Sequence, residues 1–323
     1  MIKFIRKAIW GLLVLGCMNQ TSAQDQGVFS GNFETNFNVF LRDSLINANN
    51  TPQYDRELTG GEAWLNLNYS IKGFNMGVRF DMFNNSNLLN PTGSYTDQGI
   101  GRWFINKQIN KFNVEVGYIY DQIGSGIIYR AWESRPLLID NALYGAKVTY
   151  DLSEDWKIKG FSGKQKFLFG ENAGIVKGGS IEGFLSLGSE ESPISLSPGI
   201  GFVNRTLNDE TMNLIVDNVK TYLPDERITP VFNTYLASLF NSLTYKSITW
   251  YVEAGYKSPE AFFDPIALRT EPSGVVTFGK FRKDPGTIIY SSLSYAKGKL
   301  GLTIEGKRTE NFDFRSDPNL SLN

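Results

Sequence analysis

Residues 121–141 hold the densest group of side chains that could do chemistry in this sequence. Arg130, Glu133, Arg135 and Asp140 place both signs of charge close together, and Asn141 adds an amide. Folded into a lumen, these side chains would form a constriction like the charged rings that select solutes in pores. The alternative is a surface loop with solvated charges, in which each ion pair contributes little.

The composition of the same segment favours the inward fold. The stretches 127–129 and 137–139 are too apolar for a freely solvated loop. Gly124 and Gly126 permit positive φ and a close approach to a wall, so we predict that they act as loop hinges. Residues 124–126 are not a phosphate loop, because Lys and Ser/Thr do not follow in the required order.

Several chemistries are excluded by composition. The 323 residues include no histidine, so a Ser-His-Asp triad, a histidine general base and a histidine-ligated zinc site are all absent. With 32 basic and 33 acidic residues, no charge excess points to nucleic acid. The carboxylates between Asp209 and Glu226 do not have the spacing of a calcium loop. We therefore predict no enzyme, no metal site, no cofactor and no nucleic-acid partner.

The first residues indicate export. Lys3, Arg6 and Lys7 precede a short apolar run at 8–16, and small residues follow at 21–23. This pattern predicts a secretory signal peptide over 1–23, whose apolar core is too short to span a bilayer. A lipoprotein-type cleavage site at Cys17 is the alternative, and it also leads to export.

The elements that must position the charged segment are strands. Phe29, Phe33 and Phe37 fall on one face of a period-two pattern, with Asn32 and Asn36 on the other. The same alternation recurs at 62–72, 74–82, 248–257 and 300–307. A period of two indicates strands with one apolar and one polar face.

The length of the strands and of their connections separates a membrane barrel from a secreted sandwich or solenoid, the main alternative. Many strands are long enough to cross a bilayer at a tilt, about 10 residues. Long connections such as 42–60, 84–98 and 258–284 alternate with short turns such as 72–73. Short turns on one side and long loops on the other are typical of outer-membrane barrels. We predict an all-β, transmembrane, antiparallel up-and-down β-barrel over residues 24–323.

The strand count suggests an incomplete barrel. About 13 strands are expected by residue 312, whereas single-chain bacterial barrels usually have an even number. Residues 316–323 read as the start of an outer loop. We therefore expect the barrel to be incomplete at the C-terminus through truncation; the alternative is an error of one strand in the count.

One long connection is expected to contain a helix. Asn208 or Asp209 can cap a segment whose apolar residues have helical spacing, and Pro224 would end it. The predicted helix covers 209–223. It could lie over the barrel mouth as a lid or rest on neighbouring loops.

The run 117–130, with Glu133, Arg135 and the stretches 139–145 and 163–167, is similar to a family of Bacteroidota outer-membrane β-barrel proteins known as a domain of unknown function. The resemblance extends from about residue 27 to the end of the chain and is most specific at 117–145. It implies an exported barrel that continues past residue 323, and it implies no substrate or catalytic residue. Pro136 departs from the pattern and puts the local backbone there in doubt.

Two functions remain open from the sequence. The first is a pore or ligand-selective channel for small solutes in the outer membrane of a Gram-negative cell, with outer-membrane lipid around it and a solute in its lumen. The second is a structural or secretion-accessory barrel that binds an envelope protein. Conductance would favour the first, and co-purification of a partner the second.

Overall fold

The fold is one long antiparallel sheet, seen in a computed structural model that describes residues 27–50, 55–88, 93–189, 192–312 and 314. Hydrogen-bonded neighbours follow the order β1-β2-β3-β4-β5-β8-β9-β10-β12-β13-β14-β15-β16, and β11 pairs with β12 at the side. All of these pairs are antiparallel. The expected all-β, up-and-down antiparallel architecture is therefore confirmed, with 14 strands in the sheet.

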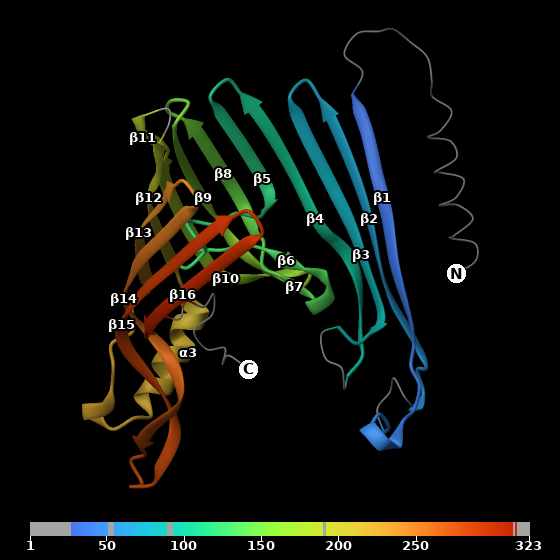
Figure 1. The fold of residues 1–323 in the computed structure, drawn as a ribbon. Coiled ribbons are helices and arrows are strands. Elements are labelled where there is room, and N and C mark those ends of the chain that lie inside the picture. The colour runs from blue at the N-terminus through green and yellow to red at the C-terminus, as the bar shows by residue number, and fades with distance from the viewer. Residues whose placement is uncertain (1–26, 51–54, 89–92, 190–191, 313, 315–323) are drawn as a thin grey trace.

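The sheet curls around an interior without closing in the part of the chain described here, where β1 and β16 form its two edges (Figure 1). Its strands are β1 (Val28–Val39), β2 (Thr59–Ile71), β3 (Phe74–Ser86), β4 (Tyr95–Ile109), β5 (Phe112–Ile119), β8 (Leu143–Asp151), β9 (Trp156–Phe167), β10 (Gly170–Gly183), β11 (Leu185–Ser189), β12 (Ser192–Thr206), β13 (Asn233–Tyr245), β14 (Ile248–Thr270), β15 (Val276–Lys297) and β16 (Leu300–Glu310).

The two faces of the sheet differ as the alternation predicts. Large apolar side chains on the outer face are exposed, including Phe37 at 72%, Leu239 at 63% and Ile304 at 61%. The inner face carries polar and charged side chains and contacts the segment between β5 and β8. No helix in the described residues is both long and apolar enough to cross a membrane.

One segment that the sequence predicts to be a loop forms β-strands instead. Residues 258–284 were predicted as a long connection, but β14 and β15 run through most of it and meet at a turn around Gly274. The register shifts between Lys257 and Glu260 and again between Asp264 and Leu268. Pro259 and Pro265 lie in these irregularities, the positions where a sheet tolerates proline. Because the prolines and bulges interrupt the period-two alternation, these parts of the strands could not be predicted from the sequence.

A helix occupies the connection between β12 and β13. Helix α3 (Asp209–Lys220) is capped by the Asn208 side chain, which accepts from the Thr211 amide at 3.1 Å. It ends before the expected residue 223, and a 3-10 turn follows at Pro224–Glu226. The buried side of α3 includes Met212, Ile215 and Val219, which belong to one apolar cluster with Ala261 and Phe281 of the β14–β15 hairpin. The helix therefore rests on this hairpin (Figure 1).

The signal peptide predicted for residues 1–23 lies outside the described residues, as does the whole final stretch 316–323, for which the start of an outer loop is predicted.

Candidate functional site

Residues 121–141, which we call the inner segment, lie inside the curve of the sheet (Figure 1). The segment turns first at Gly126, whose amide donates to the Ile123 carbonyl at 2.9 Å, and a bridge pairs Gln122 with Arg130. It then forms β6 (Glu133–Ser134), a 3-10 turn at Arg135–Leu137, and β7 (Ile139–Asp140). Gly124 and Gly126 have φ of 55° and 92°, values that favour glycine.

Apolar packing holds the first half of the inner segment against the sheet. Ile123 and Ile128 are almost completely buried, and they join a cluster contributed by six strands: Ile119, Leu143, Phe161, Val176, Val203 and Leu236. Gly201 of β12 makes this contact possible, because a Cβ there would overlap the Ile123 side chain and lie 3.0 Å from Ile128.

A polar contact attaches the same turn to β14. The backbone amide and the hydroxyl of Ser125 both donate to Glu253 Oε2, the amide at 2.9 Å, and the Tyr251 hydroxyl donates to the same oxygen at 2.7 Å. A Cβ on Gly124 would lie 2.8 Å from the Glu253 carboxylate. The inner segment thus begins at β5 and is attached to β14, well separated in strand order.

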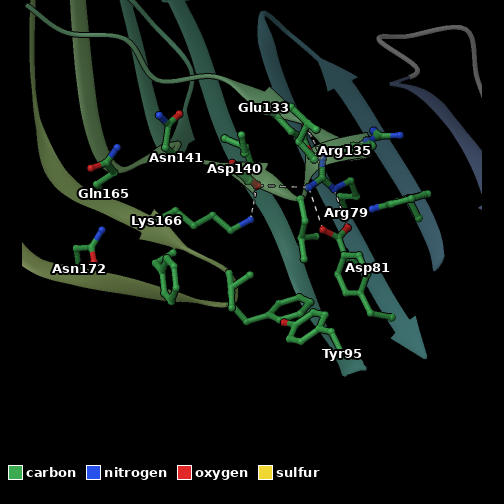
Figure 2. Close-up of a pocket in the computed structure, with 18 residues that line it drawn as sticks. Arg79, Asp81, Tyr95, Glu133, Arg135, Asp140, Asn141, Gln165, Lys166 and Asn172 are labelled. Carbon is green, nitrogen blue, oxygen red and sulfur yellow. Dashed lines mark hydrogen bonds and ion pairs between the residues drawn. The ribbon is translucent and has the colours of Figure 1, made fainter. Parts of the chain in front are cut away.

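The second half of the inner segment contributes to a group of five side chains, the charged cluster: Arg79, Asp81, Glu133, Asp140 and Lys166. Figure 2 shows them pointing toward one another from β3, β6, β7 and β9. Arg79 donates to Asp81 through Nε at 2.7 Å and Nη2 at 2.9 Å, and its Nη1 lies 2.6 Å from Glu133. Asp140 accepts from Lys166 and lies 3.6 Å from Arg79.

Burial makes this cluster more than a set of surface ion pairs. Arg79, Asp81 and Lys166 are each less than a tenth exposed. Paired charges at such depth depend on one another, because removing one partner leaves an uncompensated buried charge. A phenol completes the arrangement: the Tyr120 hydroxyl donates to Asp140 at 2.8 Å, and burial, followed by the Asp140 charge, raises the pKa of that phenol. Tyr120 therefore stays a donor at neutral pH.

A backbone irregularity brings the β3 and β4 side chains into place. The β3–β4 register shifts so that Arg79 faces Arg102 while Phe80 faces Ile100, which leaves Gly101 as the extra residue. A Cβ at Gly101 would overlap the Asp81 carboxylate. The β-bulge at Gly101 thus allows the Asp81 carboxylate to lie against the backbone. It also changes the direction in which the neighbouring side chains point.

The structure separates the sequence-predicted site residues into two groups. Glu133, Arg135, Asp140 and Asn141 line one pocket of about 370 Å³ beside Lys166. Arg135 pairs with Glu34 of β1 at 2.6 Å, and Asn141 Oδ1 accepts from the Trp132 amide at 2.6 Å.

Arg130 lies apart from Glu133, Arg135 and Asp140, whereas Asn141 lines both pockets and donates through Nδ2 to the Arg130 carbonyl at 3.5 Å. Its guanidinium lies over the Trp132 ring at 5.2 Å, and the residue lines a different pocket with Phe312 and Phe314. The cause is its pairing with Gln122, which keeps it on the first turn of the segment.

Sequence reasoning missed three members of the cluster, Arg79, Asp81 and Lys166. The only signal available was a charged pair at alternate positions on the polar face of the strand at 74–82. Such a pair is ordinary on a lumen-facing strand, and nothing local shows that Lys166 lies next to it.

The fold and the site define an all-β protein whose 14-stranded antiparallel sheet surrounds a charged inner segment, which carries the small β6-β7 sheet. The chain belongs to the family of unknown function DUF6029, which matches residues 4–323. No curated protein matches the sequence.

Solved structures similar to this chain are distant in sequence. OpdK of Pseudomonas aeruginosa, crystallised with vanillate, has 10% identity, a TM-score of 0.34, and coverage of 90% of this chain and 94% of that chain. A BenF-like porin from Pseudomonas fluorescens has 11% identity, a TM-score of 0.32, and coverage of 91% and 95%.

Proposed function

We propose that the protein is an outer-membrane β-barrel that conducts small solutes, with the inner segment narrowing its lumen. The observation that supports this most is the contrast between the two faces of the sheet. Side chains such as Phe33, Phe37, Leu239 and Ile304 are exposed on the outside while charges gather inside. In water such an apolar surface would be costly, whereas in a bilayer it faces lipid and the polar face borders water.

The inner segment then sets the width of the passage. It is attached by apolar packing to six strands and by Ser125 to β14, so it acts as a fixed narrowing. The charged cluster and the neighbouring pocket of about 370 Å³ lie where it meets β3 and β9. A solute would pass close to these charges.

Planar-bilayer recording of the full chain tests the proposal. We expect discrete conductance steps, and larger ones when residues 124–139 are replaced by a short Gly-Ser linker. Deleting residues 44–47, a 3-10 turn outside the sheet, is the control and should leave conductance unchanged. Absence of conductance in both the wild type and the linker variant would contradict the proposal.

A second candidate function, binding of an envelope protein, is favoured by the β14–β15 hairpin. Apolar side chains near its end are strongly exposed, including Ile266 at 79% and Phe278 at 73%. Replacing residues 262–280 with a two-residue turn should abolish co-purification of any such partner and leave conductance intact. A protein that co-purifies equally with both forms would contradict a hairpin-bound partner.

A further inference from the structure

Arg102 of β4 differs from its neighbouring arginines in lacking a carboxylate partner. Within the described ranges it makes no ion pair, and its buried Nε has no hydrogen-bond partner. Its guanidinium lies between two rings, 4.7 Å from the centre of Phe104 and 4.7 Å from that of Tyr120. The rings hold the cation in position without neutralising it.

The pocket around Arg102 is positive. It has a volume of about 260 Å³, and its lining includes Arg79, Arg102 and Arg135 but no carboxylate among the described residues. Arg79 and Arg135 are already paired, with Asp81 at 2.7 Å and with Glu34 at 2.6 Å. Arg102 is therefore the cation available to a ligand.

Amides line the remainder of the same pocket. Asn32, Asn66 and Asn68 come from β1 and β2, and no described residue hydrogen-bonds their side chains. An amide offers both donors and an acceptor, which matches hydroxyl groups that also donate and accept. A planar guanidinium matches a carboxylate, which it can bind through two parallel hydrogen bonds.

We propose that this pocket is a binding site for a small hydroxylated carboxylate, with Arg102 binding the carboxylate and the three asparagines binding hydroxyls. The proposal rests on the proposed channel function only in that the ligand reaches the pocket through the lumen. Glycine builds the site: a Cβ at Gly77 would overlap Phe104 and lie 2.7 Å from Asn68, so glycine there lets the ring lie flat under Arg102.

The test is calorimetric titration of the full chain in detergent with gluconate and with sorbitol, which share a hydroxylated six-carbon skeleton and differ in the carboxylate. We expect saturable binding of gluconate and none of sorbitol. Arg102→Gln should weaken gluconate binding by about tenfold or more, as expected for loss of a charge-assisted hydrogen bond. Arg130→Gln removes a guanidinium that also lies over a ring, outside the pocket, and should leave binding unchanged.

A conservative variant covers the case in which Arg102→Gln does not fold. Arg102→Lys keeps the charge and loses the planar fork, so its gluconate binding should be weaker than that of the wild type. Equal binding of sorbitol and gluconate, equal loss in Arg130→Gln, or full binding in both Arg102 variants would overturn the proposal. Conductance without Arg102-dependent binding would overturn this site alone, whereas Arg102-dependent binding without conductance would overturn only the channel.

Discussion

Arg79 and Arg102 face each other across β3 and β4, yet their environments are opposite. Arg79 is buried and contacts three carboxylates, whereas Arg102 contacts two rings and no carboxylate in the described residues. Moving two charges from water into a buried ion pair is favourable only when the geometry of the pair is good. The Arg79 pairs have that geometry, so Arg79 stabilises the fold, while Arg102 is the group that we propose binds a ligand.

Arg79→Met should therefore destabilise the protein strongly. Asp81 and Glu133 would lose their shared cation in a buried place, at a cost of about 3–5 kcal/mol in the free energy of unfolding. Urea unfolding in detergent micelles, followed by tryptophan fluorescence, measures it. Lys220→Met is the control: it breaks an exposed pair with Asp217 and should cost at most about 0.5 kcal/mol. Similar midpoints for the two variants would contradict a structural role for Arg79.

At the scale of elements, glycines on the inner face of the sheet make room for the inner segment. Gly201 of β12 lies under Ile123 and Ile128, and Gly255 of β14 also lies near Ile128, which a Cβ there would approach to 3.5 Å. A side chain at Gly201 would compete with Ile123 for the same space, whereas a Cβ at Gly255 would only contact Ile128. The path of the inner segment thus depends on residues far from it in sequence.

Gly201→Leu should displace the inner segment from the sheet. Overpacking of this kind costs about 1–3 kcal/mol, enough to populate an undocked segment. Limited trypsin digestion should then cleave after Arg130, which is followed by Ala131, faster than in the wild type. Gly301→Leu is the matched control, because a Cβ at Gly301 has no neighbour within 4 Å. Unchanged cleavage in Gly201→Leu would show that the segment is not held by this contact.

At the scale of the whole molecule, the difference between the two faces of the sheet determines its surroundings. Neighbouring residues on one strand meet different media: Leu293 of β15 pairs with Ile304 on the apolar outer face, and Ser292 pairs with Glu305 on the polar inner face. Under the proposed function, the outer face of the sheet meets lipid and the inner face borders water.

Leu293→Arg and Ser292→Arg test this asymmetry one residue apart. If the outer face meets hydrocarbon, Leu293→Arg should cost about 2–4 kcal/mol near the bilayer midplane, while Ser292→Arg on the lumen side should cost much less. Reversible folding into lipid vesicles under a urea titration gives both values. Equal costs would contradict a lipid-facing outer surface.

Sequence patterns predicted the elements better than the site. Period-two alternation gave the strands at 29–41, 62–72, 74–82 and 300–307 because each face of a strand has its own composition. The outer parts of β14 and β15 were not predicted, since bulges at Pro259 and Pro265 interrupt that alternation. Glu133, Arg135, Asp140 and Asn141, which line one pocket, could be proposed together because they lie close together in the chain.

By itself, the sequence determined where the regular strands lie and which face of each is apolar, because both depend on neighbours two positions away. Only the tertiary structure decided that Glu133 and Asp140 meet Arg79 and Lys166, and that Arg102 meets no carboxylate of the described residues. Those outcomes depend on the register between strands and on a bulge at Gly101. Register is a relation between distant parts of the chain, so the charges could not be paired from local pattern.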